Sequence, residues 1–379
     1  MQVLAVDIGT GTQDIYLFRP GVSLENGYKL VLPSPTMIVR GRIREATRLG
    51  EDLLLTGVTM GGGPSQWAAQ DHLQAGRRIF ATADAARSFN DDLEWVAREM
   101  GVIVVGEDEA AALKGVTRIL LQDLDLGAIE SAFGAFGVSL QLDALAVAVF
   151  DHGAAPPGVS DRQFRFDYLL GRLREERTLA AFAHRAEEVP PVMTRMRAVV
   201  QSAKEVGCPL VVMDTAPAAA LGATFDPIVA ARERLLIANV GNFHTLAFRL
   251  GPEGIEGLFE HHTGLLNQPA IEALLSGLAD GSLSRQQVFA NKGHGALILQ
   301  PEPFSLDDGP FGVVVTGPRG GMLRASRLRP YFAVPFGDMM LTGCIGLLAA
   351  IGEKLPNLAG PIRAGLAGIG AERAPWEVE

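Results

Sequence analysis

The sequence predicts a two-lobed α/β protein, and three observations carry this prediction. Apolar segments typical of buried strands alternate with helical segments in both halves of the chain. Three apolar strands run directly into glycine-rich turns, near residues 9, 241 and 317. Thr178–Val206 has a helical pattern, interrupted at Pro190. We therefore predict an N-terminal lobe at 1–176, a helical bridge at 177–207, a C-terminal lobe at 208–355 and a tail at 356–379.

The elements follow from apolar runs and the residues that interrupt them. In the N-terminal half we predict strands from Val3 and at 15–18, 29–32, 35–39, 53–57, 78–81, 102–105 and 143–149, with helices at 41–50, 65–75 and 91–100. In the C-terminal half we predict strands at 210–213, 235–239, 243–249, 255–260 and 313–315, with helices at 269–278, 284–290 and 338–351.

Composition excludes several classes of protein. Of 379 residues, 48% are hydrophobic and 20% are charged, as in packed globular enzymes. The net charge of -10 argues against a nucleic-acid partner. The apolar run at 339–351 is too short to span a membrane, and no basic segment precedes the first strand, so we expect a cytoplasmic protein. Two cysteines exclude a disulfide framework and a cysteine-rich zinc site.

The first glycine loop has the chemistry of a phosphate-binding turn. An acid ends the strand, glycines let the backbone approach phosphate, and hydroxyl and N–H groups donate to its oxygens. The predicted nucleotide contacts here are Asp7, Gly9, Thr10, Gly11, Thr12 and Gln13. The acid, Asp7, is also the predicted magnesium ligand, acting through water. An ordinary hairpin with a polar turn is the alternative.

Two later loops are the other candidate nucleotide contacts. The turn at Gly241 and Asn242 joins two apolar strands, but it lacks an acid and has fewer glycines. The turn after the strand at 313–315 offers bare backbone against which an adenine ring can lie. Its predicted contacts are Gly317, Pro318, Gly320 and Gly321. Taken alone, each is equally consistent with a simple turn.

The order of these loops resembles the superfamily of acetate and sugar kinases, heat-shock chaperone ATPases and actin. The resemblance implies an actin-like (ribonuclease-H-like) fold with an interlobe cleft that binds ATP and Mg²⁺. In carbohydrate kinases of this superfamily, an Asp before Ala-Ala-Leu-Gly-type residues is the general base. Here Asp214 precedes Ala219–Gly222 in a similar way, which implies the same role. A helix N-cap is the alternative.

The histidines depart from the kinase pattern. Four lie in turn-like motifs, at His152, His261, His262 and His294, and we predict substrate contacts or metal ligands there, with Asp151 as a second candidate catalytic acid. Adjacent residues of a strand point to opposite faces, so at most one of the neighbouring pair reaches a given site. Arg162 and Arg165 form a candidate anion-binding patch. Satisfied loop histidines and a solvated helix face are the alternatives.

Three further motifs resemble a narrower family. Thr59–Pro64, Asp151–Pro157 and Ser160–Phe166 are similar to a bacterial and archaeal family of unknown function that is labelled "putative pyruvate formate-lyase activating protein". A radical-SAM activase needs three cysteines in a Cys-x-x-x-Cys-x-x-Cys run, which this sequence lacks. The label therefore does not describe the chemistry of this chain.

Four functions are compatible with the residues. The first is an ATP-dependent phosphotransferase or ATPase on a small, anionic substrate. The second is an ATP-dependent activator of a metalloenzyme that holds an iron–sulfur cluster with Cys208 and Cys344 across a homodimer. The third is a nucleotide-sensing module without turnover. The fourth is a metal-dependent enzyme that uses the histidines and no nucleotide.

Overall fold

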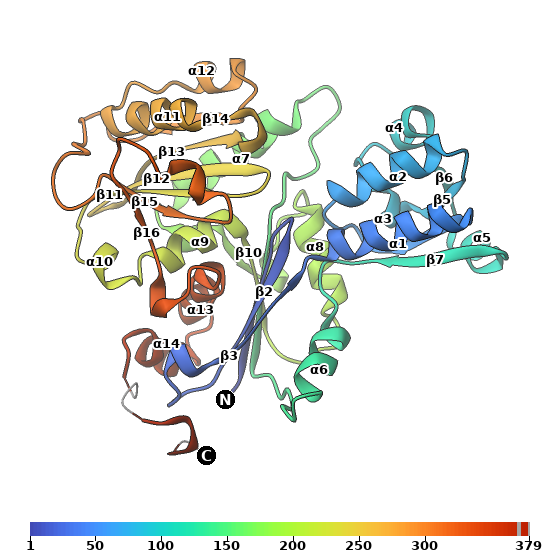
Figure 1. The fold of residues 1–379 in the computed structure, drawn as a ribbon, viewed down its shortest axis with the longest axis horizontal. Helices are drawn as coiled ribbons and strands as arrows, with labels where there is room; N and C mark the ends of the chain where they lie inside the picture. The colour runs from blue at the N-terminus through green and yellow to red at the C-terminus, as the bar shows by residue number, and fades with distance from the viewer. Residues whose placement is uncertain (370–372, 378–379) are drawn as a thin grey trace.

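Three β-sheets organise the computed structural model, which describes residues 1–369 and 373–377 (Figure 1). The first sheet has the strand order β3-β2-β1-β8-β10-β9. Its strands are β1 (Val3–Ile8), β2 (Thr12–Phe18), β3 (Tyr28–Pro33), β8 (Ala144–Val149), β9 (Ala183–Arg185) and β10 (Leu210–Asp214). Strands β1, β8 and β10 are parallel, and β2 and β3 complete an antiparallel meander from β1.

The first sheet is covered on both faces, which explains its uninterrupted apolar strands. Every residue of β1 and β8 is buried. One face packs on α13 (Thr342–Lys354) and α14 (Ala359–Leu366). The other face packs on α6 (Leu126–Gly134) and α8 (Thr194–Ser202).

Five strands of the second sheet repeat the order of five strands of the first. It reads β14-β13-β12-β11-β15-β16, with β15 and β16 parallel to β11 and a meander formed by β11, β12 and β13. The strands are β11 (Leu235–Val240), β12 (His244–Gly251), β13 (Gly254–His262), β14 (Gly295–Ile298), β15 (Val313–Thr316) and β16 (Pro330–Phe332). When β9 is left out of the first sheet and β14 out of the second, both sheets have the strand order third, second, first, fourth, fifth. This duplicated order is that of the ribonuclease-H-like unit, and the predicted two-lobed actin-like fold is confirmed.

Residues 35–121 form a third layered unit, which we call the inserted lobe. Its parallel sheet contains β4 (Asp52–Gly57), β5 (Ile79–Thr82), β6 (Ile103–Val105) and β7 (Val116–Leu121). Its helices are α1 (Pro35–Leu49), α2 (Pro64–Gln74), α3 (Ala83–Ala86), α4 (Leu93–Trp95) and α5 (Glu107–Ala112). It has its own apolar core and projects to the right in Figure 1.

Two local predictions are wrong. The edge strand predicted at 35–39 is the first turn of α1, where Pro35 fits because this position needs no N–H donor. The helices predicted over 178–206 are interrupted by β9, and only α8 is an α-helix in that range. The proline pair at 190–191 lies before α8, as the interruption suggested.

Two crossing helices join the lobes. Helix α9 (Thr215–Ala223) follows β10 and buries Ala216 and Ala220 against the second sheet, whereas α13 packs on the first sheet. They cross at Gly222 and Gly346, where a Cβ on either glycine would overlap the backbone of the facing helix. The remaining α-helices are α7 (Asp161–Glu175), α10 (Pro227–Ala230), α11 (Gln268–Asp280) and α12 (Arg285–Ala290). Within the described residues, none of the helices combines the length and apolar character needed to cross a membrane.

Candidate functional site

The three glycine loops converge on one pocket between the lobes. It encloses about 860 Å³, its open mouth included. The predicted nucleotide contacts that line it are Asp7, Gly9, Thr10, Gly11, Thr12, Gly241, Asn242, Gly317 and Pro318. The remaining three lie away from it: Gln13 donates to the Pro33 carbonyl, and Gly320 and Gly321 begin a 3₁₀ turn. We call this pocket the three-loop pocket.

Close backbone approaches hold the loops together. A Cβ on Gly11 would lie 2.9 Å from the Asn242 amide nitrogen, so the first and second loops touch across the cleft. Gly317 has a φ of 92°, and a Cβ there would lie 2.7 Å from the Val240 carbonyl. The Arg319 N–H donates to that same carbonyl at 2.9 Å. Gly317 therefore requires glycine for packing, in addition to any ligand.

A pair of carboxylates lies at the base of the three-loop pocket. Asp7 and Asp14 are direct neighbours on β1 and β2, and both line the pocket. Thr215, the first residue of α9, donates to Asp7 Oδ1 at 2.6 Å. Burial raises the pKa of Asp7 to about 6, and burial together with the Asp7 charge raises the pKa of Asp14 to about 8. Asp14 Oδ1 is buried without a hydrogen-bond partner among the described residues.

This pair fits a hard divalent cation. Mg²⁺ prefers carboxylate oxygens, and a cation there would relieve the repulsion between two buried acids. The unpartnered Asp14 oxygen gives that cation a free ligand atom. Sequence reasoning found Asp7 and missed Asp14, although the tight hairpin between them was visible and fixes them as neighbours.

Asp214 and Arg165 form a buried ion pair outside the pocket wall. The Arg165 guanidinium donates to Asp214, to Glu260 at 3.2 Å and to the Asp151 carbonyl at 3.0 Å. Asp214 also accepts from the Ala216 N–H, so its carboxylate caps α9. Because Asp214 ends β10 and Glu260 lies on β13, Arg165 links the two sheets.

Asp151 and Arg162 are also bound within the protein. The Asp151 carboxylate accepts from the Gly153 and Met196 N–H groups, both at 2.8 Å, and so fixes the start of α8. Burial raises the pKa of Asp151. Arg162 donates to the Gly293 carbonyl at 2.6 Å and lies over the Phe289 ring. The structure therefore does not bring Arg162 and Arg165 together as an open anion patch.

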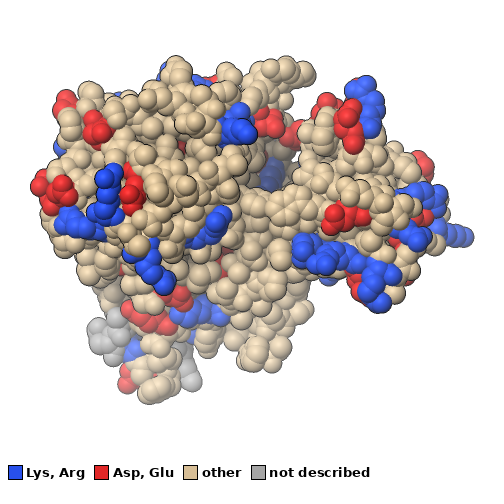
Figure 2. Space-filling view, turned by 45° about the horizontal axis from the view of Figure 1, so that its top comes forward, with Lys and Arg blue, Asp and Glu red and all other residues tan. Residues whose placement is uncertain are grey.

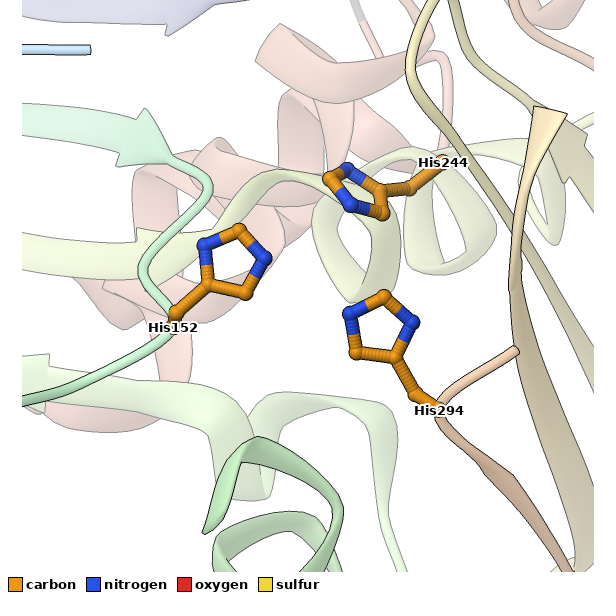
Figure 3. A group of neighbouring side chains, drawn as sticks. All are labelled: His152, His244 and His294. Atoms are coloured by element: carbon orange, nitrogen blue, oxygen red, sulfur yellow. The ribbon is translucent and has the colours of Figure 1, made fainter. Parts of the chain in front are cut away.

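Three histidines from distant segments face one another in the cleft (Figure 3). His152 follows β8, His244 begins β12, and His294 precedes β14. One nitrogen from each ring lies within 4.8 Å of the others. We call this group the histidine triad. The sequence predicted His152 and His294, and it missed His244.

His262 and His261 take opposite faces of β13, as the strand period predicts. His262 lies opposite His244 in the β12–β13 ladder, and its ring centroid is 4.7 Å from that of His294. His261 points away and bonds to the Asn291 carbonyl at 3.0 Å. Of the two neighbours, only His262 reaches the triad, which confirms the prediction.

A second hollow adjoins the three-loop pocket and opens toward the inserted lobe. Both are lined by Gly9, Thr10, Phe150, Arg195, Phe243 and His244. The second hollow adds His152 and residues of the inserted lobe, among them Trp67 and Asp91. In the space-filling view the surface is notched between the inserted lobe, on the right, and the rest of the molecule (Figure 2).

Arg195 is a cation at the junction of the two hollows that sequence reasoning did not single out. It pairs with Asp123 at 2.7 Å and donates to the Phe150 carbonyl at 2.7 Å. It lies on α8, in a segment whose sequence carries no glycine or turn motif. Only the packing of α8 on the first sheet reveals its position.

Both cysteines are free and packed on opposite faces of the first sheet. Cys344 lies in α13, fully buried on one face, and Cys208 packs against the cluster on the other. They therefore cannot share an iron–sulfur cluster, as one alternative required.

Comparison with known proteins identifies the family. A family model described as "Putative pyruvate format-lyase activating enzyme (DUF1786)" matches residues 60–322, more than half of the chain. The chain belongs to this family. The matched segment includes the histidine triad and His262, whereas the first glycine loop and α13 lie outside it. A comparison with the curated proteins finds no match.

Solved structures of low similarity also match. A ROK hexokinase from Thermus thermophilus is 13% identical, with 93% of this chain and 100% of that chain covered and a TM-score of 0.29. The apo pSK41 ParM protein is 11% identical, with 94% and 98% covered and a TM-score of 0.29. At such scores the fold assignment rests on the duplicated strand order.

Proposed function

We propose that this protein binds Mg²⁺ and ATP in the three-loop pocket and acts as a phosphotransferase or ATPase on a small, anionic substrate. One observation carries the proposal: glycine turns from both lobes and two buried carboxylates meet at a single pocket. Backbone N–H groups at such turns suit phosphate oxygens. The duplicated fold supports a kinase-like or ATPase-like role at the same cleft.

Each group of pocket residues would contact a different part of the bound nucleotide, metal or acceptor. Asp7 and Asp14 would hold Mg²⁺, which when bound neutralises charge on the phosphates. The first and second loops would bind phosphate, and the third would lie against the nucleoside. Arg195 would face the transferred phosphoryl group, because it lies where the pocket meets the second hollow. That hollow would hold the acceptor.

The predicted general-base role of Asp214 has a structural requirement. Its carboxylate is bound by Arg165, so it must exchange this partner before it can accept a proton. A chain with two distant cysteines cannot supply three thiolates to a radical-SAM cluster, so we do not extend the activating activity in the family description to this protein.

Calorimetry with Mg²⁺ and either ADP or ATP tests the proposal. We expect binding by the wild type and by Asp71→Asn, which alters an exposed carboxylate on α2. Asp7→Asn should weaken binding at least about tenfold, a loss of about 1.4 kcal/mol. Absence of binding to the wild type, or equal binding by Asp7→Asn and Asp71→Asn, would refute it. A screen of anionic acceptors, with Asp214→Asn as a variant, then tests turnover.

A further inference from the structure

The histidine triad has the composition and shape of a transition-metal site. The ring centroids of His152, His244 and His294 lie 5.2, 5.2 and 5.7 Å apart, close to an equilateral triangle. Three nitrogens at about 2.05 Å from one zinc ion lie about 3.3 Å apart. The upper separation of 4.8 Å exceeds that value by about 1.5 Å, so the rings must turn toward one another when an ion binds.

Unpartnered nitrogens distinguish the triad from ordinary packing. Nε2 of His244 and both ring nitrogens of His294 are buried and accept or donate no hydrogen bond among the described residues. The His294 side chain is 0% exposed. A buried polar atom without a partner costs about 1–3 kcal/mol, so unpartnered nitrogens on two facing rings indicate that a ligand belongs between them.

The surroundings favour neutral imidazole, the form that binds metals. Burial lowers the pKa of His152 to about 3, and burial and neighbouring positive charges lower the pKa of His244 and His294. No carboxylate belongs to the triad among the described residues. Three nitrogen ligands select zinc, cobalt, nickel or iron(II) over magnesium or calcium.

A buried carboxylate lies beside the deepest histidine of the triad. Glu260 Oε1 lies 3.7 Å from Nε2 of His294, and Arg165 holds the other carboxylate oxygen at 3.2 Å. Glu260 Oε1 is itself buried without a hydrogen-bond partner among the described residues, so an unpaired carboxylate oxygen lies beside the deepest of the three rings.

We propose that His152, His244 and His294 bind one divalent transition metal ion, with a fourth coordination position open to the second hollow. Three protein ligands and an open position are typical of metal sites that bind a substrate or water. His152 and His244 line the hollow, so the open position faces it. The ligand that fits this position is an anionic oxygen donor, such as a carboxylate or phosphate.

Metal binding by the full-length chain, stripped with chelator and without nucleotide, tests this site. We expect one equivalent of Zn²⁺ or Co²⁺ per chain. His152→Gln and His244→Gln, at half-buried positions, should each weaken binding by more than about 10-fold to 100-fold, the loss typical of an outer-shell partner alone. The matched controls are His261→Gln, on the opposite face of β13, and His184→Gln, bonded to Tyr168. Both controls should bind as the wild type does.

The spectrum of the Co²⁺ form tests the ligand set. We expect visible bands without thiolate charge transfer, and a shift of these bands when inorganic phosphate or acetate is added. Binding below a tenth of an equivalent, or equal binding by the triad variants and the controls, would overturn the site. Co²⁺ bands that shift with neither phosphate nor acetate would overturn the proposal of an open coordination position. Because no nucleotide is present, failure here is distinguishable from failure of nucleotide binding.

Discussion

Gly343 lies where the three-loop pocket meets α13, and its substitution isolates the contribution of Asp7. A Cβ at this position would overlap the Asp7 carboxylate, which lies directly against the helix backbone. The carboxylate must therefore move when alanine replaces glycine. Its other oxygen accepts the 2.6 Å hydrogen bond from Thr215, and this bond is lost as the group moves.

Two opposing contributions determine how much Gly343→Ala changes the free energy of unfolding. Alanine in place of glycine inside a helix stabilises by about 1 kcal/mol. Loss of a hydrogen bond to a charged acceptor costs about 1.5–3 kcal/mol. We expect Gly343→Ala to lower the free energy of unfolding by about 0.5–2 kcal/mol.

Gly352 provides a matched control on the same helix. A Cβ there would lie 3.5 Å from Ile362 Cγ2, an ordinary van der Waals contact, so Gly352→Ala keeps the propensity gain without the clash. The two variants should differ by about 1.5–3 kcal/mol, which is the hydrogen-bond term alone. Urea unfolding measures this difference, and calorimetry with Mg²⁺ and ADP measures binding. Equal stability and equal affinity of the two variants would refute the placement of Asp7.

Three further predictions follow from buried ionisable groups. Arg165→Met removes the cation shared with Glu260 and should destabilise the chain by about 3–5 kcal/mol in urea unfolding; an unchanged midpoint would contradict the buried pair. The pKa values of Asp7 and Asp14 in the folded chain, about 6 and about 8, lie above the unfolded value of 3.8. The free energy of unfolding should therefore decrease as pH rises from 3.8 to about 8. In EDTA, Asp14→Asn should reduce the decrease in Tm between pH 6 and 8. A variant whose Tm depends on pH as that of the wild type does would contradict the raised pKa of Asp14. Cys344, fully buried, should resist a thiol reagent in the native protein, and rapid labelling there would contradict the packing of α13.

The first hairpin and the two later glycine turns were predictable because each is a local pattern. A strand, a glycine turn and a return strand need only neighbouring residues, and the meander at 235–262 follows the same rule. Their convergence on one pocket was inferred from their order along the chain. Arg195 was not found, because its role depends on packing between segments that are far apart in the sequence. Asp14 was missed although the hairpin places it beside Asp7, because its buried, unpartnered oxygen is visible only in the structure.

Local β-propensity gave a wrong prediction at a segment whose structure is determined by tertiary packing. The segment at 35–39 has three β-branched residues and one proline, yet Pro35 opens a helix that packs on the inserted sheet. Strands 53–57, 78–81 and 102–105 were predicted near their observed bounds. Their membership of a separate sheet depends on parallel pairings between distant strands, which no local pattern determines.

The hairpin between β11 and β12 connects the two proposed sites through one turn. Its backbone at Gly241 and Asn242 lines the three-loop pocket, and its next strand begins with His244 of the triad. The Gly241 N–H donates to the His244 carbonyl at 2.9 Å, so the turn that would contact phosphate also fixes the backbone of a metal ligand. A ligand that shifts this turn must therefore move His244. Binding of a metal and binding of a nucleotide should each change the affinity for the other, by the same factor.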